Sequence, residues 1–236
     1  MNNVNGWMCK VCGAISQGQI QRPEDDICAN CRRSLDETEY ILPHEFETEI
    51  QCLVTENHRI TLRGIQQSEN EYVAHIEGEL AGEDPEIIRS EVRHAETFFE
   101  DLRATANRNA LVSLVTRLEH RTRKLVRQLQ LSTDKKSPPV ARDMEELNVR
   151  LGAAAPISVQ FFVDLVTARD SVIHGDSQAQ WEYQGKIRRV ADKYTNVYGE
   201  LGFTEEHLSE AIEKVTTQVK WYDERIAASR TNGGAG

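Results

Sequence analysis

The chain has 236 residues, of which 39% are hydrophobic and 28% are charged, and its formal net charge is −10. These values are typical of a soluble globular protein, and no run of 18 apolar residues provides a membrane span. The first residues lack the charged and apolar regions of a signal peptide, so we expect a cytoplasmic protein whose thiols are reduced.

Residues 1–40 carry two pairs of closely spaced cysteines. Cys9 and Cys12 form one CxxC pair, and Cys28 and Cys31 form a second pair, with 15 residues between the two pairs. Two such pairs supply the four thiolates of a tetrahedral zinc site, and the segment resembles a zinc ribbon. Four sulfur ligands leave no open position, so we expect one structural Zn²⁺ per chain, which takes the place of a hydrophobic core. The alternative, two disulfides, conflicts with a reducing compartment.

Residues 41–84 show alternating apolar and polar side chains, which predicts a small antiparallel β meander. The expected strands are residues 46–54, 60–64 and 72–80. The segment has 2 basic and 10 acidic residues, so its outer face should repel phosphate. We expect Cys52 to be a small core residue on the first strand and His58 to lie on the surface.

Residues 85–230 are predicted to be a helical domain, which makes the fold class mainly α. Asp84 and Pro85 form a typical helix start, with an N-cap side chain and proline in the first turn. The expected helices are 85–103 and 107–131 (or one long helix), 142–151, 157–174, 180–201 and 204–228. Residues 132–140 are a predicted loop, Thr204 is the expected N-cap of the last helix, and residues 231–236 are a predicted disordered tail.

Basic residues gather in the first part of this domain, because residues 85–142 have 12 basic and 7 acidic side chains. Arg117, Arg121 and Lys124 follow one another at helical spacing and form a basic stripe, for which we consider an RNA-binding role. The alternative is an ordinary solvated helix face.

A cluster of chemically capable residues ends the apolar helix 157–174. Arg169, Asp170 and His174 occur within six residues and are followed by Gly175. Arg169 and His174 are separated by about 140° around a straight helix, whereas Asp170 and His174 share a face, where the carboxylate could orient the imidazole. A simpler interpretation is a capped helix end, because a histidine in the last turn is favoured by the helix dipole.

The arginine, polar residue and histidine resemble the Arg-x4-6-His signature of HEPN domains, which are all-α bundles. Residues 118–123, with Glu119, are similar to the Glu- and Arg-bearing helix that accompanies this signature. The resemblance covers about residues 107–176 and implies a HEPN-like helical bundle, which the predicted zinc ribbon and β meander would precede. The ribbon and the meander lie outside the basic HEPN pattern.

This resemblance implies a metal-independent endoribonuclease of toxin or phage-defence type. Two motifs would face each other across a cleft in a homodimer or a higher even oligomer. His174 would act as general acid or base, Arg169 would stabilise the phosphate and Asp170 would orient the histidine, with the ribose 2′-OH as nucleophile. The expected partners are an RNA substrate and an antitoxin or another defence protein. We expect no membrane association.

Two other functions remain open. A non-catalytic HEPN-like adaptor, or a nucleotide- or partner-binding protein, would use the zinc ribbon for docking. This alternative predicts that Arg169 or His174 is buried in intramolecular pairs. A zinc-ribbon nucleic-acid binder with a helical dimerisation domain is a further alternative, although the ribbon segment offers few basic residues.

Overall fold

The computed structural model describes residues 6–9, 15–17, 38–41, 45–129, 131, 140–152 and 154–232. The chain divides into two compact units, residues 1–49 and 50–236, and each is described by itself. The helical unit therefore begins well before residue 85, the boundary that the sequence predicts.

The first unit contains a three-stranded antiparallel sheet. Its strands are β1 (Gly6–Cys9), β2 (Ile15–Gln17) and β3 (Thr38–Ile41), in the order β2-β1-β3. Cys9 is the last residue of β1 and pairs with Thr38 of β3. The other predicted zinc ligands, Cys12, Cys28 and Cys31, lie outside the described residues.

Residues 45–79 are helical, so the predicted β meander is wrong. They form α1 (Glu45–Ile50), the π-helical segment η2 (Gln51–Glu56) and α2 (Asn57–Glu79). The less exposed residues of this stretch recur every three or four positions and include Val54, His58, Leu62, Ile65, Glu69, Val73, Ile76 and Leu80. This is the period of an amphipathic helix and not of a strand.

Two single-residue predictions in this stretch fail with the meander. Cys52 is exposed on η2 and does not belong to the core. His58 is buried, and its Nε2 lies 2.7 Å from Oδ1 of Asn107 on α3. The imidazole needs this partner, because a buried polar group without a hydrogen bond is costly.

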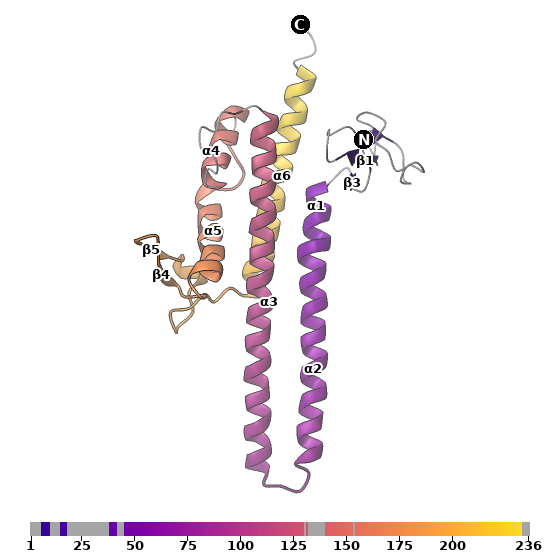
Figure 1. Ribbon diagram of the computed structural model, residues 1–236, viewed down its shortest axis with the longest axis vertical. Coiled ribbons are helices and arrows are strands. Elements are labelled where there is room, and N and C mark those ends of the chain that lie inside the picture. The colour runs from indigo at the N-terminus through magenta and orange to yellow at the C-terminus, as the bar shows by residue number, and fades with distance from the viewer. Residues whose placement is uncertain are drawn as a thin grey trace. The chain divides into compact units, whose positions relative to one another are not determined.

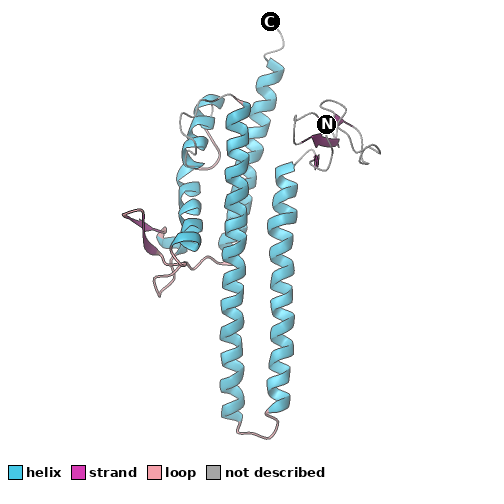
Figure 2. Cartoon of the chain, viewed as in Figure 1, coloured by secondary structure: helices cyan, strands magenta, loops and turns pink. Residues whose placement is uncertain are grey.

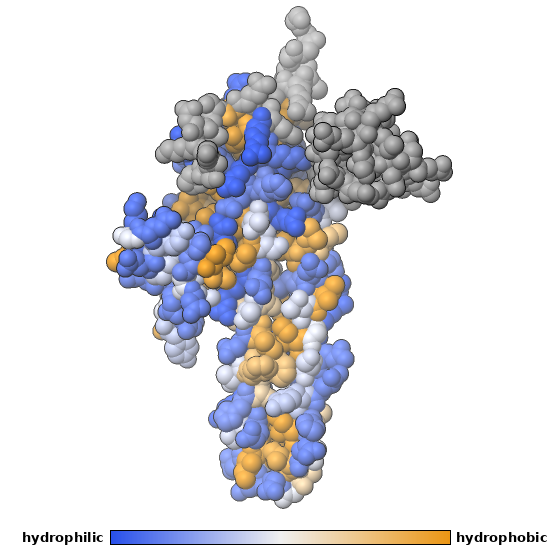
Figure 3. All heavy atoms as spheres, viewed as in Figure 1, coloured by the Kyte–Doolittle hydropathy of each residue, from blue (hydrophilic) through white to orange (hydrophobic). Residues whose placement is uncertain are grey.

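α3 (Pro85–Gln128) is one continuous helix of 44 residues. It begins as predicted, since the side chain of Asp84 accepts a hydrogen bond from the N–H of Glu86 at 2.9 Å. No glycine or proline interrupts it near residues 105–107, where Ala106 is buried and Asn107 bonds to His58. α2 and the N-terminal half of α3 form a long antiparallel hairpin (Figure 1), and apolar residues follow the seam between the two helices (Figure 3).

The C-terminal half of α3 packs with α4 (Val140–Leu151), α5 (Val159–His174) and α6 (Glu205–Asn232) in a helical bundle. Its core is mostly aliphatic and aromatic, with fully buried residues that include Leu111, Leu114, Leu118, Leu147, Phe162, Leu165, Val215 and Tyr222. Thr204 caps α6 as predicted, because its Oγ1 accepts the N–H of His207 at 3.3 Å. α6 continues to Asn232, so the first two residues of the predicted tail are helical; the rest lie outside the described residues.

The helix predicted at 180–201 is absent, and a β-hairpin occupies its first half (Figure 2). The hairpin comprises β4 (Gln180–Tyr183) and β5 (Lys186–Arg189), followed by the short 3-10 helix η3 (Asp192–Tyr194). Gln184 and Gly185 link the strands with φ values of 51° and 71°, the left-handed pair that a type I′ turn requires. The described fold is therefore mainly helical with small antiparallel sheets, and none of its described helices is long and apolar enough to cross a membrane.

Candidate functional site

The predicted motif lies at the C-terminal end of α5, where the chain reverses tightly. The buried carbonyl of Ser171 accepts hydrogen bonds from the N–H of Gly175 at 2.9 Å and of Ser177 at 3.0 Å. The hydroxyl of Ser171 donates to the carbonyl of Gln178 at 2.7 Å. Asp176 and Ser177 adopt left-handed φ values of 49° and 61°, so the residues after His174 are held in one specific conformation.

The β4–β5 hairpin packs directly on this helix end through Trp181. A Cβ added to Gly175 would lie 2.7 Å from Cγ of Trp181, so only glycine permits the close approach. Trp181 is only 8% exposed, although most of the hairpin is exposed. The glycine therefore serves the packing of the hairpin as well as the end of the helix.

His174 is exposed and its ring stacks on Tyr183 of β4. The two ring centroids are 4.4 Å apart and the ring planes are inclined by 25°. The imidazole is thus held by an aromatic neighbour while solvent reaches it. Tyr183 is 9 residues further along the chain than His174. The predicted helix 180–201 gave no reason to expect this contact.

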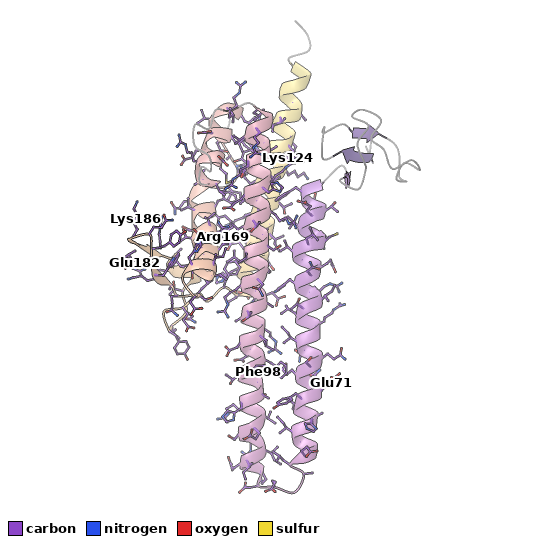
Figure 4. The ribbon with its side chains drawn as sticks, viewed as in Figure 1. Glu71, Phe98, Lys124, Arg169, Glu182 and Lys186 are labelled. Carbon is purple, nitrogen blue, oxygen red and sulfur yellow. The ribbon has the colours of Figure 1, made fainter. Side chains whose placement is uncertain are left out.

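Arg169 is largely buried between α5 and α3 (Figure 4). Its Nη2 and Nη1 donate to the Glu119 carboxylate at 2.7 and 3.2 Å, and its Nε lies 2.7 Å from Oδ1 of Asp170. Burial lowers the pKa of Arg169, but the hydrogen bonds and charges of Glu119 and Asp170 more than offset this effect and raise the pKa above its usual value. The guanidinium is therefore permanently charged and ties the two helices together.

Asp170 contacts Arg169 in this arrangement, and no Asp170–His174 contact is found among the described residues. The orienting role expected for Asp170 therefore stays a prediction. The sequence associates Glu119 with the motif because its helix resembles the companion helix of HEPN domains. In the structure Glu119 accepts hydrogen bonds from Arg169 of the motif.

A second buried charge lies in the same interior. Asp143 of α4 is fully buried, and neither of its carboxylate oxygens has a hydrogen-bond partner among the described residues. Burial raises the pKa of Asp143, and the nearby charge of Arg123 only partly opposes this effect. The interior of the α3–α4–α5 bundle thus holds several ionisable groups.

The predicted RNA-binding stripe is partly used within the bundle. Nη2 of Arg121 donates to Oδ1 of Asp223 on α6 at 2.6 Å, and the arginine side chain is only 16% exposed. Arg117 and Lys124 are half-buried and also have interactions within the chain. The stripe therefore contributes to helix packing, and its contact with RNA stays a prediction.

The hairpin supplies site residues that the sequence prediction missed. Tyr183 pairs with Lys186 across the strands, and Trp181 pairs with Arg188. Side chains of directly opposite residues lie on the same face of a sheet, so both cations share the face that carries the aromatic rings. The signal in the sequence is the alternation of Trp181, Tyr183, Lys186 and Arg188 around a Gln-Gly turn.

No group of three or more metal-ligating side chains that could bind a metal occurs among the described residues. Comparison with protein-family models, with curated proteins and with solved structures gives no significant match for this chain. The HEPN resemblance therefore depends on the residues of the motif and their setting at the end of a helix.

Proposed function

We propose that the helical unit is an endoribonuclease in which His174 is the acid–base residue. The observation that carries this proposal is an exposed imidazole at a rigid helix end, stacked on Tyr183 and bordered by a hairpin face with two cations. An accessible imidazole can both accept and donate a proton, so it is suited to proton transfer at a phosphodiester. Metal-independent cleavage and a role in defence or as a toxin, restrained by a partner protein, follow from the HEPN resemblance.

The proposed reaction uses the RNA itself as the nucleophile. His174 takes the proton of a ribose 2′-OH, whose oxygen attacks the adjacent phosphorus. The bond to the 5′-oxygen then breaks, and this oxygen receives a proton from a protonated histidine. The products are a 2′,3′-cyclic phosphate and a 5′-hydroxyl end, and the second histidine belongs to the other protomer of the proposed dimer.

Arg169 is the proposed residue that stabilises charge on the phosphate. Glu119 takes two of its five N–H donors and Nε faces Asp170, which leaves N–H groups for a phosphate oxygen. The bidentate pair fixes the guanidinium before substrate binds, which favours electrostatic stabilisation of the transition state.

The same ion pair supports a second candidate function, a non-catalytic HEPN-like adaptor. Arg169 is only 13% exposed and its partners are intramolecular, which is the arrangement that an adaptor predicts. In that case the only role of Arg169 is to stabilise the bundle. The two functions then differ in whether removal of His174 abolishes RNA cleavage.

Cleavage of RNA decides between them. The 236-residue chain is incubated with a fluorescent single-stranded RNA in EDTA. Wild type is compared with His174→Ala and with His75→Ala, a control at an exposed position of α2. We expect His174→Ala to lower the cleavage rate by about 10²-fold or more and His75→Ala to match wild type. Equal cleavage by wild type and His174→Ala contradicts the proposal, and an uncleaved RNA supports the adaptor.

The proposed dimer is measured on the same samples. Sedimentation should give twice the 26.8 kDa mass of the chain at concentrations where RNA is cleaved. Specific activity should fall on dilution as the dimer dissociates, because each site needs residues of both copies. Full specific activity in a monomeric sample contradicts the composite site.

A further inference from the structure

The β4–β5 hairpin separates its charges by face. Tyr183 and Lys186 are opposite each other, as are Trp181 and Arg188, so these four side chains share one face. The other face carries Gln180, Glu182, Ile187 and Arg189. The face with the aromatic rings therefore has two basic residues and no acidic one, although the whole chain is acidic.

This face is also the one that meets the helix end. Trp181 is buried against Gly175, and the Tyr183 ring stacks on His174. The Cβ atoms of a cross-strand pair lie about 5 Å apart, which puts Lys186 next to the residue that contacts His174. The structure leaves every residue of β5 exposed, so both cations are accessible to a ligand.

Neither cation is committed to a carboxylate among the described residues. Arg189, on the opposite face, forms an ion pair with Asp192 at 3.0 Å, whereas no ion pair is found for Lys186 or Arg188 in the described part of the chain. The turn is fixed by two left-handed residues, Gln184 and Gly185, so the strands hold the cations at a defined spacing.

We infer that the face formed by Tyr183, Lys186 and Arg188 binds single-stranded RNA and holds it at His174. Lys186 and Arg188 contact successive phosphates, and Tyr183 adds an aromatic surface for a base. Cations next to aromatic rings are the general means of binding single strands, and a duplex cannot offer its bases to such a surface. The inference rests on the proposed function for its RNA substrate.

Binding is measured by fluorescence anisotropy with a labelled single-stranded RNA over a series of salt concentrations. Arg188→Gln and Arg189→Gln form a matched pair, because they remove equal charge from adjacent exposed residues on opposite faces. We expect Arg188→Gln to weaken binding severalfold and Arg189→Gln to leave it close to wild type. The Lys186→Gln/Arg188→Gln double variant should lose about tenfold or more, and the slope of log affinity against log salt should fall by about 1.4, the value for two phosphate contacts to a single strand.

A second measurement separates this inference from the proposed function. His174→Ala should abolish cleavage and lower RNA affinity less than the double variant does, so its loss of cleavage reports chemistry, while the double variant reports binding. Tyr183→Leu keeps an apolar side chain and should weaken single-stranded RNA without changing the salt slope. If wild type binds RNA with these dependences but never cleaves it, the hairpin inference stands and the enzyme proposal fails.

The reverse outcome overturns the inference alone. Cleavage by wild type, together with unchanged affinity in the double variant, would mean that another surface holds the RNA. Equal losses in Arg188→Gln and Arg189→Gln would likewise contradict a face-specific contact. Absence of RNA binding by wild type would also overturn it. Thermal unfolding of each variant verifies that the exposed substitutions leave the fold intact.

Discussion

Gly175 is the position where one added methyl group should have the largest local effect. In Gly175→Ala the new Cβ would meet Cγ and Cδ2 of Trp181 at 2.7 and 2.8 Å, so the hairpin must move away from the helix end. We expect a loss of about 1–3 kcal/mol in the free energy of unfolding, measured by urea denaturation. Gly64→Ala is the control, because open space surrounds this glycine in the interior of α2 and alanine should stabilise the helix by about 0.5–1 kcal/mol. Unchanged stability of Gly175→Ala would contradict the close packing.

Asp143 should make stability depend on pH. Because burial raises its pKa in the folded state, the folded chain holds this proton more tightly than the unfolded chain does. The free energy of unfolding therefore falls as pH rises through the interval above 3.8, the ordinary pKa of the group, and up to its folded-state pKa. Asp143→Asn removes the buried charge and should be more stable than wild type at pH 7 by about 1–3 kcal/mol, a gap that closes toward pH 4.

The control for this prediction lies on the same helix. Glu145→Gln changes an exposed carboxylate of α4 and should leave stability within about 0.5 kcal/mol of wild type at both pH values. Denaturant titrations at several pH values supply the comparison. A constant difference between Asp143→Asn and wild type at every pH would show that the charge of Asp143 does not limit stability.

Among the elements, α3 and α5 are joined by the Glu119–Arg169 ion pair, whose side chains are 19% and 13% exposed. Removing one partner leaves a buried charge, so Glu119→Ala and Arg169→Ala should each cost about 3–5 kcal/mol. In a double-mutant cycle the coupling energy should be about 1–3 kcal/mol. The Glu86–Arg89 pair, 76% and 66% exposed on α3, is the control and should show less than about 1 kcal/mol. A coupling energy near zero for Glu119 and Arg169 would contradict the tie between the helices.

The elements also show where sequence patterns suffice. α3 and α5 start at good caps, Asp84 and Ser158, and their apolar residues follow a helical period, so local signals identify them. Residues 46–54 alternate apolar and polar side chains by coincidence, and this alternation suggested strands. The less exposed residues of 58–80 instead follow a helical period, and this helix packs on α3. Residues 180–189 alternate too, but their strand signal depends on recognising the Gln-Gly turn.

For the candidate site, sequence alone indicates the chemistry but not the contacts. Arg169 and His174 are identifiable from the motif, and Glu119 from the helix that resembles its companion. The commitment of Arg169 to Glu119 depends on how α3 and α5 pack, across 50 residues of sequence. The stacking of His174 on Tyr183 depends on a hairpin whose position is set by Gly175 and Trp181. Such distant contacts leave little trace in local patterns.

At the scale of the whole molecule, the chain divides into residues 1–49 and 50–236. This division predicts that loss of the metal from the first unit leaves the stability of the helical unit unchanged. We expect the purified protein to hold one Zn²⁺ per chain and the Cys9→Ser/Cys12→Ser variant to hold none, as measured by elemental analysis, because a CxxC pair provides half of the ligands. Cys52→Ser is the control and should retain the metal, because Cys52 is exposed in η2 outside the cysteine pairs.

The double variant should keep the helical signal of wild type in far-ultraviolet circular dichroism, and its main unfolding transition should match that of wild type. Retained zinc in the double variant would contradict the four-cysteine site, and collapse of the helical signal would contradict the independence of the two units.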